Sequence, residues 1–153
     1  MSLGDKSKSI GVVTELTLIT PILPGKADEL AAILKKIQLN PSAVIGDIST
    51  IHFARWVIID DGARLLFTSN FDGTWQSYLN DFTIKIPDGL DRIWGHCVDY
   101  PGTKHFDLFC AWVDKYQVVT TCFYPAYPNF TVNDIKKALR EKALLDEFLE
   151  KLG

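Results

Sequence analysis

The side chains with the greatest chemical potential lie between Ile51 and Trp75, in the stretch IHFARWVIIDDGARLLFTSNFDGTW. Arg55 stands there among large apolar residues, and a guanidinium in such surroundings needs a carboxylate, a carbonyl or an anionic ligand. Asp72, near the end of the same stretch, is a suitable carboxylate. We therefore predict that Arg55 and Asp72 lie close together, either as a structural ion pair or as the polar end of a pocket.

Four further residues complete the predicted site. Asn70 comes two positions before Asp72, and Trp75 and Tyr78 begin an apolar stripe with helical spacing. Rings at such positions are more often core residues than ligand contacts. If the core is hollow, however, they form an apolar wall with the Tyr78 hydroxyl as its polar group. The candidate catalytic residues are Arg55 and Asp72, and the candidate ligand contacts are Asn70, Trp75, Tyr78 and His96.

The three histidines, His52, His96 and His105, hold the remaining acid–base and metal-binding potential. Strict alternation along a strand places His52 and Arg55 on opposite faces, which favours a hydrogen-bonded core or interface role for His52 over a role as a base. No two histidines have the spacing of a zinc site, so no metal site is predicted. Each could be an axial ligand of haem. The leading interpretation requires no cofactor, and haem is the alternative.

Composition excludes several classes of protein. The chain has 153 residues, a net charge of -3 and no run of basic residues, so neither nucleic acid nor a membrane surface is expected as a partner. No apolar run reaches the ~20 residues of a membrane helix. Three cysteines without C-x-x-C spacing fit a reduced, cytoplasmic setting. Residues 1–9 are expected to be disordered or tag-like, and residues 10–153 to form one domain.

The elements that must position the site begin with a β-hairpin. Two β-branched and aromatic runs, 51–59 and 64–70, flank the turn Asp60-Asp61-Gly62-Ala63. An amphipathic helix at 26–37 follows a first strand, and Thr131-x-x-Asp134 resembles a capping box that starts the last helix. The other predicted elements are a strand at 12–23, a helix capped by Thr74, helical turns at 90–94 and 106–113, and a strand at 117–124.

This order predicts an α+β fold of the ferredoxin-like βαββαβ type. The antiparallel sheet would have helices on one face, an extra helical insert before the last strand, and a C-terminal helix. Both faces of the strand from Ile51 are largely apolar, although a face without helices is usually polar. A second subunit is therefore expected to cover that face, and the predicted partner is another copy of this chain. Tyr124-Pro125-Ala126-Tyr127-Pro128 is a rigid aromatic turn, predicted as the edge of a lid or part of an interface.

The segment LTLITPILPGKADELAAIL resembles the opening of dimeric α/β-barrel proteins, with a first strand, a Pro-Gly turn and an amphipathic helix. In that superfamily two ferredoxin-like sheets pack face to face. The resemblance covers roughly residues 12–124 as topology and pattern. It implies a homodimer and a pocket between the helices and the sheet, where a small apolar molecule could bind, but no particular reaction.

Three functions stay open from the sequence. One is an oxygenase-like enzyme acting on an apolar substrate without a cofactor, and another is a non-catalytic ligand-binding or dimerisation module. The third is a haem protein, since dye-decolourising peroxidases carry a G-x-x-D-G motif whose last two positions resemble Asp72-Gly73. Ser69 replaces the leading glycine of that motif, and the simpler interpretation is a turn that leads into the helix at Thr74.

Overall fold

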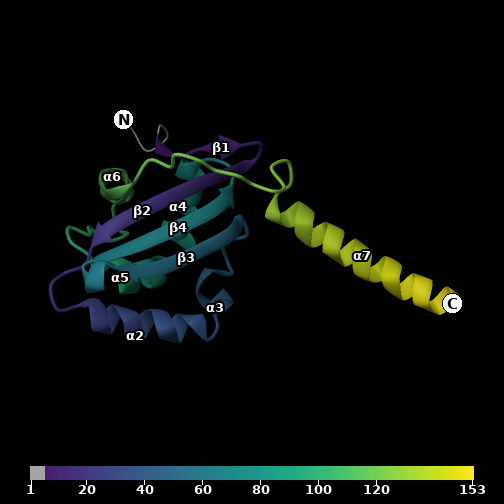
Figure 1. Cartoon of the computed structure of the whole chain (residues 1–153), viewed down its shortest axis with the longest axis horizontal. Coiled ribbons are helices and arrows are strands. Elements are labelled where there is room, and N and C mark those ends of the chain that lie inside the picture. The colour runs from purple at the N-terminus through teal and green to yellow at the C-terminus, as the bar shows by residue number, and fades with distance from the viewer. Residues whose placement is uncertain (1–5) are drawn as a thin grey trace.

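A four-stranded antiparallel sheet forms the centre of the fold, with strand order β1-β2-β4-β3 (Figure 1). The computed structural model describes residues 6–153. Its strands are β1 (Ser9–Ile10), β2 (Val13–Pro21), β3 (Ile51–Ile59) and β4 (Arg64–Asp72). The helices are α2 (Ala27–Gln38), α3 (Ser42–Ile45), α4 (Trp75–Lys85), α5 (Pro87–Trp94), α6 (Phe106–Tyr116) and α7 (Val132–Leu152), and the short 3-10 turn η1 spans Asp60–Gly62.

The predicted hairpin is present. β3 and β4 pair antiparallel, and the residues of the turn between them, Asp60, Asp61 and Gly62, all have positive φ. Asp and Gly tolerate that left-handed conformation better than most residues. β2 pairs with the other edge of β4, so β2 and β3 run parallel with β4 between them. The three strands and α2 therefore form a split β-α-β unit.

The predicted last strand at 117–124 does not form, so the βαββαβ order is wrong. Gln117 makes an isolated bridge with Leu18, and the Val118 amide donates to the Thr17 carbonyl. Beyond this point the chain makes side-chain contacts in place of main-chain pairing: the Thr120 hydroxyl donates to Glu15 at 2.6 Å. A β-strand requires continuous backbone pairing, and the β-branched composition of QVVTTCFY does not supply it.

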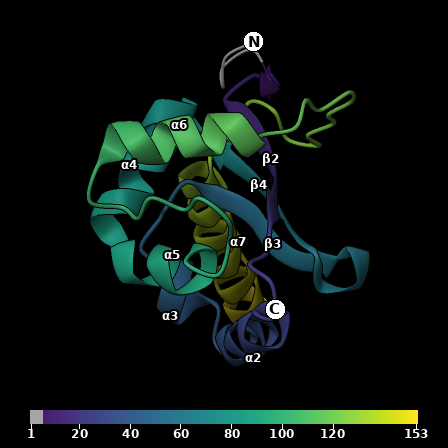
Figure 2. The same ribbon diagram turned by 90° about the vertical axis from the view of Figure 1, so that its left-hand side faces the viewer.

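One face of the sheet, the covered face, packs against α4, α5 and α6 (Figure 2). A cluster of three rings joins the strands to α5: the Phe67 centroid is 5.0 Å from those of Trp56 and Trp94, which are 6.0 Å apart. The core is closely filled with leucine, isoleucine and aromatic side chains from the strands and the helices above them. This layer supplies most of the hydrophobic stabilisation of the domain.

The opposite face, the open face, carries no helix among the described residues. Cross-strand pairs arrange it in rows, because residues opposite each other in a ladder point to the same side. One row is Thr17, Thr68 and Arg55, and the next is Ile19, Leu66 and Val57. Phe53, also on this face, is 75% exposed. The unusual apolar character predicted for both faces of β3 is therefore present, and part of it is uncovered.

The C-terminal helix α7 projects away from the domain (Figure 1). Its start has the predicted capping box: the Thr131 hydroxyl accepts from the Asp134 amide, and the Asp134 carboxylate accepts from the Thr131 amide. None of its residues is buried. At the other end of the chain residues 1–5 lie outside the described residues, whereas the Lys8 amide donates to Glu15 at 2.7 Å. No helix within 6–153 has the length and apolar character needed to cross a membrane.

Candidate ligand-binding site

A β-bulge decides where His52 points. Ile51 pairs with Phe71 and Phe53 pairs with Asn70, so His52 is the additional residue on β3. Such a bulge interrupts strict alternation. His52 consequently reaches Asp72 and lies on the same open face as Arg55, which corrects the prediction that the two residues lie on opposite faces.

His52 and Asp72 form a close pair. The distance from His52 Nε2 to Asp72 Oδ1 is 2.6 Å, and the two side chains are only 12% and 10% exposed. The other oxygen, Asp72 Oδ2, accepts a hydrogen bond from the Val132 amide at 2.8 Å. Asp72 therefore orients the imidazole and also anchors the first turn of α7. With a proton on Nε2 facing the carboxylate, Nδ1 is left as a hydrogen-bond acceptor.

Arg55 does not pair with Asp72. Its Nε donates to Thr68 Oγ1 at 3.2 Å, and no carboxylate lies within ion-pair distance of it among residues 6–153. Thr68 and Asp72 are four residues apart on β4, which corresponds to roughly 13 Å. The predicted ion pair is therefore wrong, although both side chains belong to the same face.

A pocket of about 310 Å³ lies on the open face beside the His52–Asp72 pair. The segment from Phe123 to Tyr127 forms one wall, and Val13, Phe53 and Asn70 of the strands form the other. This size is at the lower end of the range for small-molecule sites, and a mostly apolar wall with few polar groups is typical of them. The polar side chains in its lining are His52 and Asn70 on the strands and Tyr124 and Tyr127 in the wall segment.

Glu15 holds the wall segment in place. Its side chain points to the open face in the same row as Asn70, and the residue is only 4% exposed. One carboxylate oxygen accepts from the Lys8 amide, and the other accepts from the Thr120 hydroxyl. These two hydrogen bonds hold the N-terminal strand region and the chain after α6 over one end of the sheet. They also give both oxygens of the buried carboxylate a hydrogen-bond partner.

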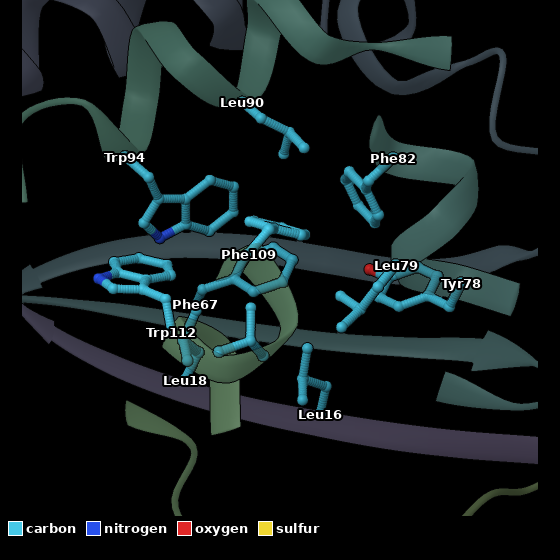
Figure 3. A pocket seen from close by; sticks show the side chains of 11 residues that line it. Leu16, Leu18, Phe67, Tyr78, Leu79, Phe82, Leu90, Trp94, Phe109 and Trp112 are labelled. Carbon is cyan, nitrogen blue, oxygen red and sulfur yellow. The ribbon is translucent and has the colours of Figure 1, made fainter. Parts of the chain in front are cut away.

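Trp75 and Tyr78 belong to the covered face and do not reach the pocket. The Tyr78 ring stacks on Phe71 with centroids 3.7 Å apart, and its hydroxyl donates to Ser69 Oγ at 2.5 Å. Burial raises the pKa of Tyr78 far above its usual value. The nearby void, lined by Leu16, Phe82, Trp94 and their neighbours, is only about 20 Å³ (Figure 3). A void of that size has room for about one water molecule, so these rings are core residues and do not form a pocket wall.

His96 lies after α5, far along the chain from the other site residues, and its Nε2 is 3.2 Å from Glu29. This contact, with Lys26 as the second cause, lowers the pKa of Glu29. The other nitrogen of His96, Nδ1, is buried and has no hydrogen-bond partner among the described residues. In this conformation Nδ1 is enclosed and Nε2 contacts Glu29, so a haem iron would have to displace Glu29 to reach His96. Within residues 6–153, no three His, Cys, Asp or Glu side chains are grouped as a metal site requires.

Of the six residues predicted for the site, Asn70 lines the open-face pocket and Asp72 lies beside it through His52. The turn Tyr124–Pro128, predicted as a lid edge or part of an interface, supplies most of the pocket wall. Sequence reasoning missed the roles of His52 and Phe53, because the bulge that moves His52 leaves no recognisable signal in Ile51-His52-Phe53. It also joined residues from opposite faces of the sheet, since Trp75 and Tyr78 follow Asp72 closely in the chain. No family model matches the chain, and no curated protein or solved structure matches it at a significant level.

Proposed function

We propose that the protein binds a small, largely aromatic molecule with one hydrogen-bonding group in the pocket between the open face and the Phe123–Tyr127 segment. The observation that carries this proposal is the combination of a 310 Å³ apolar pocket with His52 and Asn70 in its wall. Aromatic walls favour a flat ring, and a side-chain amide can both donate to and accept from a hydroxyl or carbonyl.

The filled core supports binding at this surface over binding inside the domain. A ligand between the helices and the sheet would have to displace Tyr78 and its packed neighbours, which would cost several kcal/mol. The open-face pocket requires no such displacement. The dimeric α/β-barrel relationship and an oxygenase-like activity remain predictions from the sequence.

Calorimetric titration with three probes, phenol, benzoate and indole, tests the proposal. At least one probe should bind, and Asn70→Ala should weaken it about tenfold through loss of one hydrogen bond. The matched control is Asn80→Ala on the exposed side of α4. Equal loss in both variants, or no binding of any probe at millimolar concentration, would contradict the proposal.

The His52–Asp72 contact favours a second candidate, proton abstraction from a bound carbon acid. In this scheme His52 Nδ1 takes the proton, and Asp72 holds the required tautomer and stabilises the imidazolium. Acetophenone in D₂O is a suitable probe, because exchange of its methyl protons is followed directly by NMR. Catalysed exchange should be lost in His52→Gln and strongly reduced in Asp72→Asn, while exchange at the uncatalysed rate in the wild type would remove this candidate.

A further inference from the structure

The chain carries two apolar surfaces that nothing in the described structure covers. One is the α7 stripe, which includes Leu145, Phe148, Leu149 and Leu152, each between 53% and 69% exposed. The other is the uncovered part of the open face, where Phe53 and Val57 stand out from β3. Helices of soluble proteins bury such stripes against a partner, and exposed apolar patches of this extent mark interaction surfaces.

We propose that α7 of one copy packs across the open face of a second copy, and that the second copy returns the same contact. The dimer is then a reciprocal helix exchange with two-fold symmetry. It covers both surfaces at once. Two sheets packed face to face would leave the α7 stripe exposed, and two paired α7 helices would leave the open face exposed.

α7 is long enough to cross the uncovered part of the open face. With 21 residues, α7 is about 31 Å long at 1.5 Å per residue. The nine-residue strands β3 and β4 are about 30 Å long. The helix is therefore long enough to cross the uncovered part of the face, and we expect two such contacts to pass the ~1,000 Å² typical of a stable interface.

Contacts at the first turn of α7 favour packing of the helix against another copy over packing against its own sheet. The Val132 amide is bonded to Asp72, and Val132 and Lys136 share a cleft with Ile45 and Phe53. These contacts fix the first turn in the outward direction visible in Figure 1. Folding back onto its own sheet would require α7 to break them.

The charges of the two surfaces are complementary. The open face carries Arg64, which is paired with Asp60, and Arg55, whose guanidinium has one hydrogen bond among the described residues, to the Thr68 hydroxyl. Glu141 lies in the α7 row Ala138, Glu141, Leu145, Phe148 and Leu152. Among residues 6–153, Lys137 is the only cation within ion-pair distance of Glu141, at 3.8 Å. Arg55 of one copy and Glu141 of the other can therefore pair once both are desolvated.

Light scattering after size exclusion, at concentrations from 1 to about 100 μM, tests the exchange in the full chain. The wild type should have twice the 17.2 kDa mass of one chain. Leu145→Asp should weaken the dimer at least about 100-fold, because it buries an unpaired charge. Ala143→Asp is the matched control, since it makes a similar change on the opposite side of α7 and should leave the mass unchanged.

Variants of the sheet separate the exchange from its alternatives. Val57→Asp should also give monomers, whereas pairing of two α7 helices predicts an unaffected dimer. Arg55→Glu and Glu141→Arg should each weaken association about tenfold, and combining them in one chain should restore it. A monomeric wild type with α7 protected from hydrogen exchange would show that the helix folds back, and a dimer insensitive to Leu145→Asp would show face-to-face sheets. Either result overturns the proposal, and neither depends on whether the pocket binds a ligand.

Discussion

The two faces of the central sheet are built from alternate residues of the same three strands, but they differ in how far their side chains are enclosed. The indole nitrogens of Trp56 and Trp94 on the covered face are buried without a hydrogen-bond partner among the described residues. On the covered face the Tyr78 hydroxyl is fully enclosed and bonded to Ser69. On the open face the Arg55 guanidinium has one hydroxyl partner, and His52 Nδ1 has no hydrogen bond among the described residues. Polar groups that are satisfied internally contribute stability, whereas groups with free capacity can recognise another molecule. The covered face holds most of the apolar core, and we propose that the open face carries recognition.

The largest expected effect is the difference in stability between two aromatic truncations on the same strand. Trp56→Ala removes a ring packed on Phe67 and Trp94 and should lower the free energy of unfolding by roughly 3–5 kcal/mol. Phe53→Ala, three residues away on the open face, should cost less than about 1 kcal/mol in the monomer. Urea denaturation of both variants measures the contrast. Similar losses of unfolding free energy in the two variants would show that the two faces do not differ in their contribution to stability.

Asp72 is an open-face residue whose loss should destabilise the fold. Asp72→Ala removes the partner of His52 and the acceptor for the Val132 amide, and should cost roughly 2 kcal/mol. The control is Asp81→Ala, because Asp81 pairs with Lys85 at 3.6 Å on the surface of α4 and should contribute about 0.5 kcal/mol or less. Thermal melting compares the two. Hydrogen exchange of the amides in the first turn of α7 should increase only in the Asp72 variant.

Tyr78 should make stability fall in alkaline solution. Burial raises the pKa of its phenol in the folded protein, whereas the unfolded phenol titrates near ~10. Its contribution is therefore fully present below pH ~10 and is lost progressively as the pH rises above that value, because only the unfolded chain releases the proton. Tyr78→Phe should lose about 1 kcal/mol at neutral pH and show a weaker decline between pH 9 and 11. Equal pH slopes for wild type and variant would show that Tyr78 is not enclosed.

The smallest perturbation is chemical labelling of the cysteines. Burial raises the pKa of Cys97, and burial together with Asp107 raises the pKa of Cys110 to about 11. Cys122 is exposed beside the pocket wall. A thiol reagent at pH 7.5 should therefore modify Cys122 first, with Cys97 reacting only on unfolding. Mass spectrometry of timed samples gives the order, and early modification of Cys97 would contradict a closed core.

Local patterns predicted most of the secondary structure. Periodicity located α2 and the hairpin, and the Thr131–Asp134 spacing located the start of α7. The strand predicted at 117–124 failed because β propensity describes a residue's fit to a pleated surface and cannot supply a pairing partner. In this chain, Thr120 bonds to the Glu15 side chain where a ladder bond was expected.

The site was harder to predict than the fold because it depends on which face each residue occupies. Asn70 and Asp72 share the open face through simple alternation, and this part was accessible to sequence reasoning. The bulge at His52 reverses the expected face of one residue, and no residue type near it requires a bulge. The separation of Arg55 from Asp72 follows from the register of the hairpin, which the sequence defines only to within a few residues.

The most direct test of the division between the faces is an amide chemical-shift map of the wild-type protein titrated with the probe that binds best. Our account predicts that the shifts concentrate at His52, Phe53 and Asn70 and at the Phe123–Tyr127 segment, while the amides of Tyr78, Phe82 and Trp94 remain unchanged. Shifts concentrated at those three core residues would contradict it, because the ligand would then lie between the sheet and the helices.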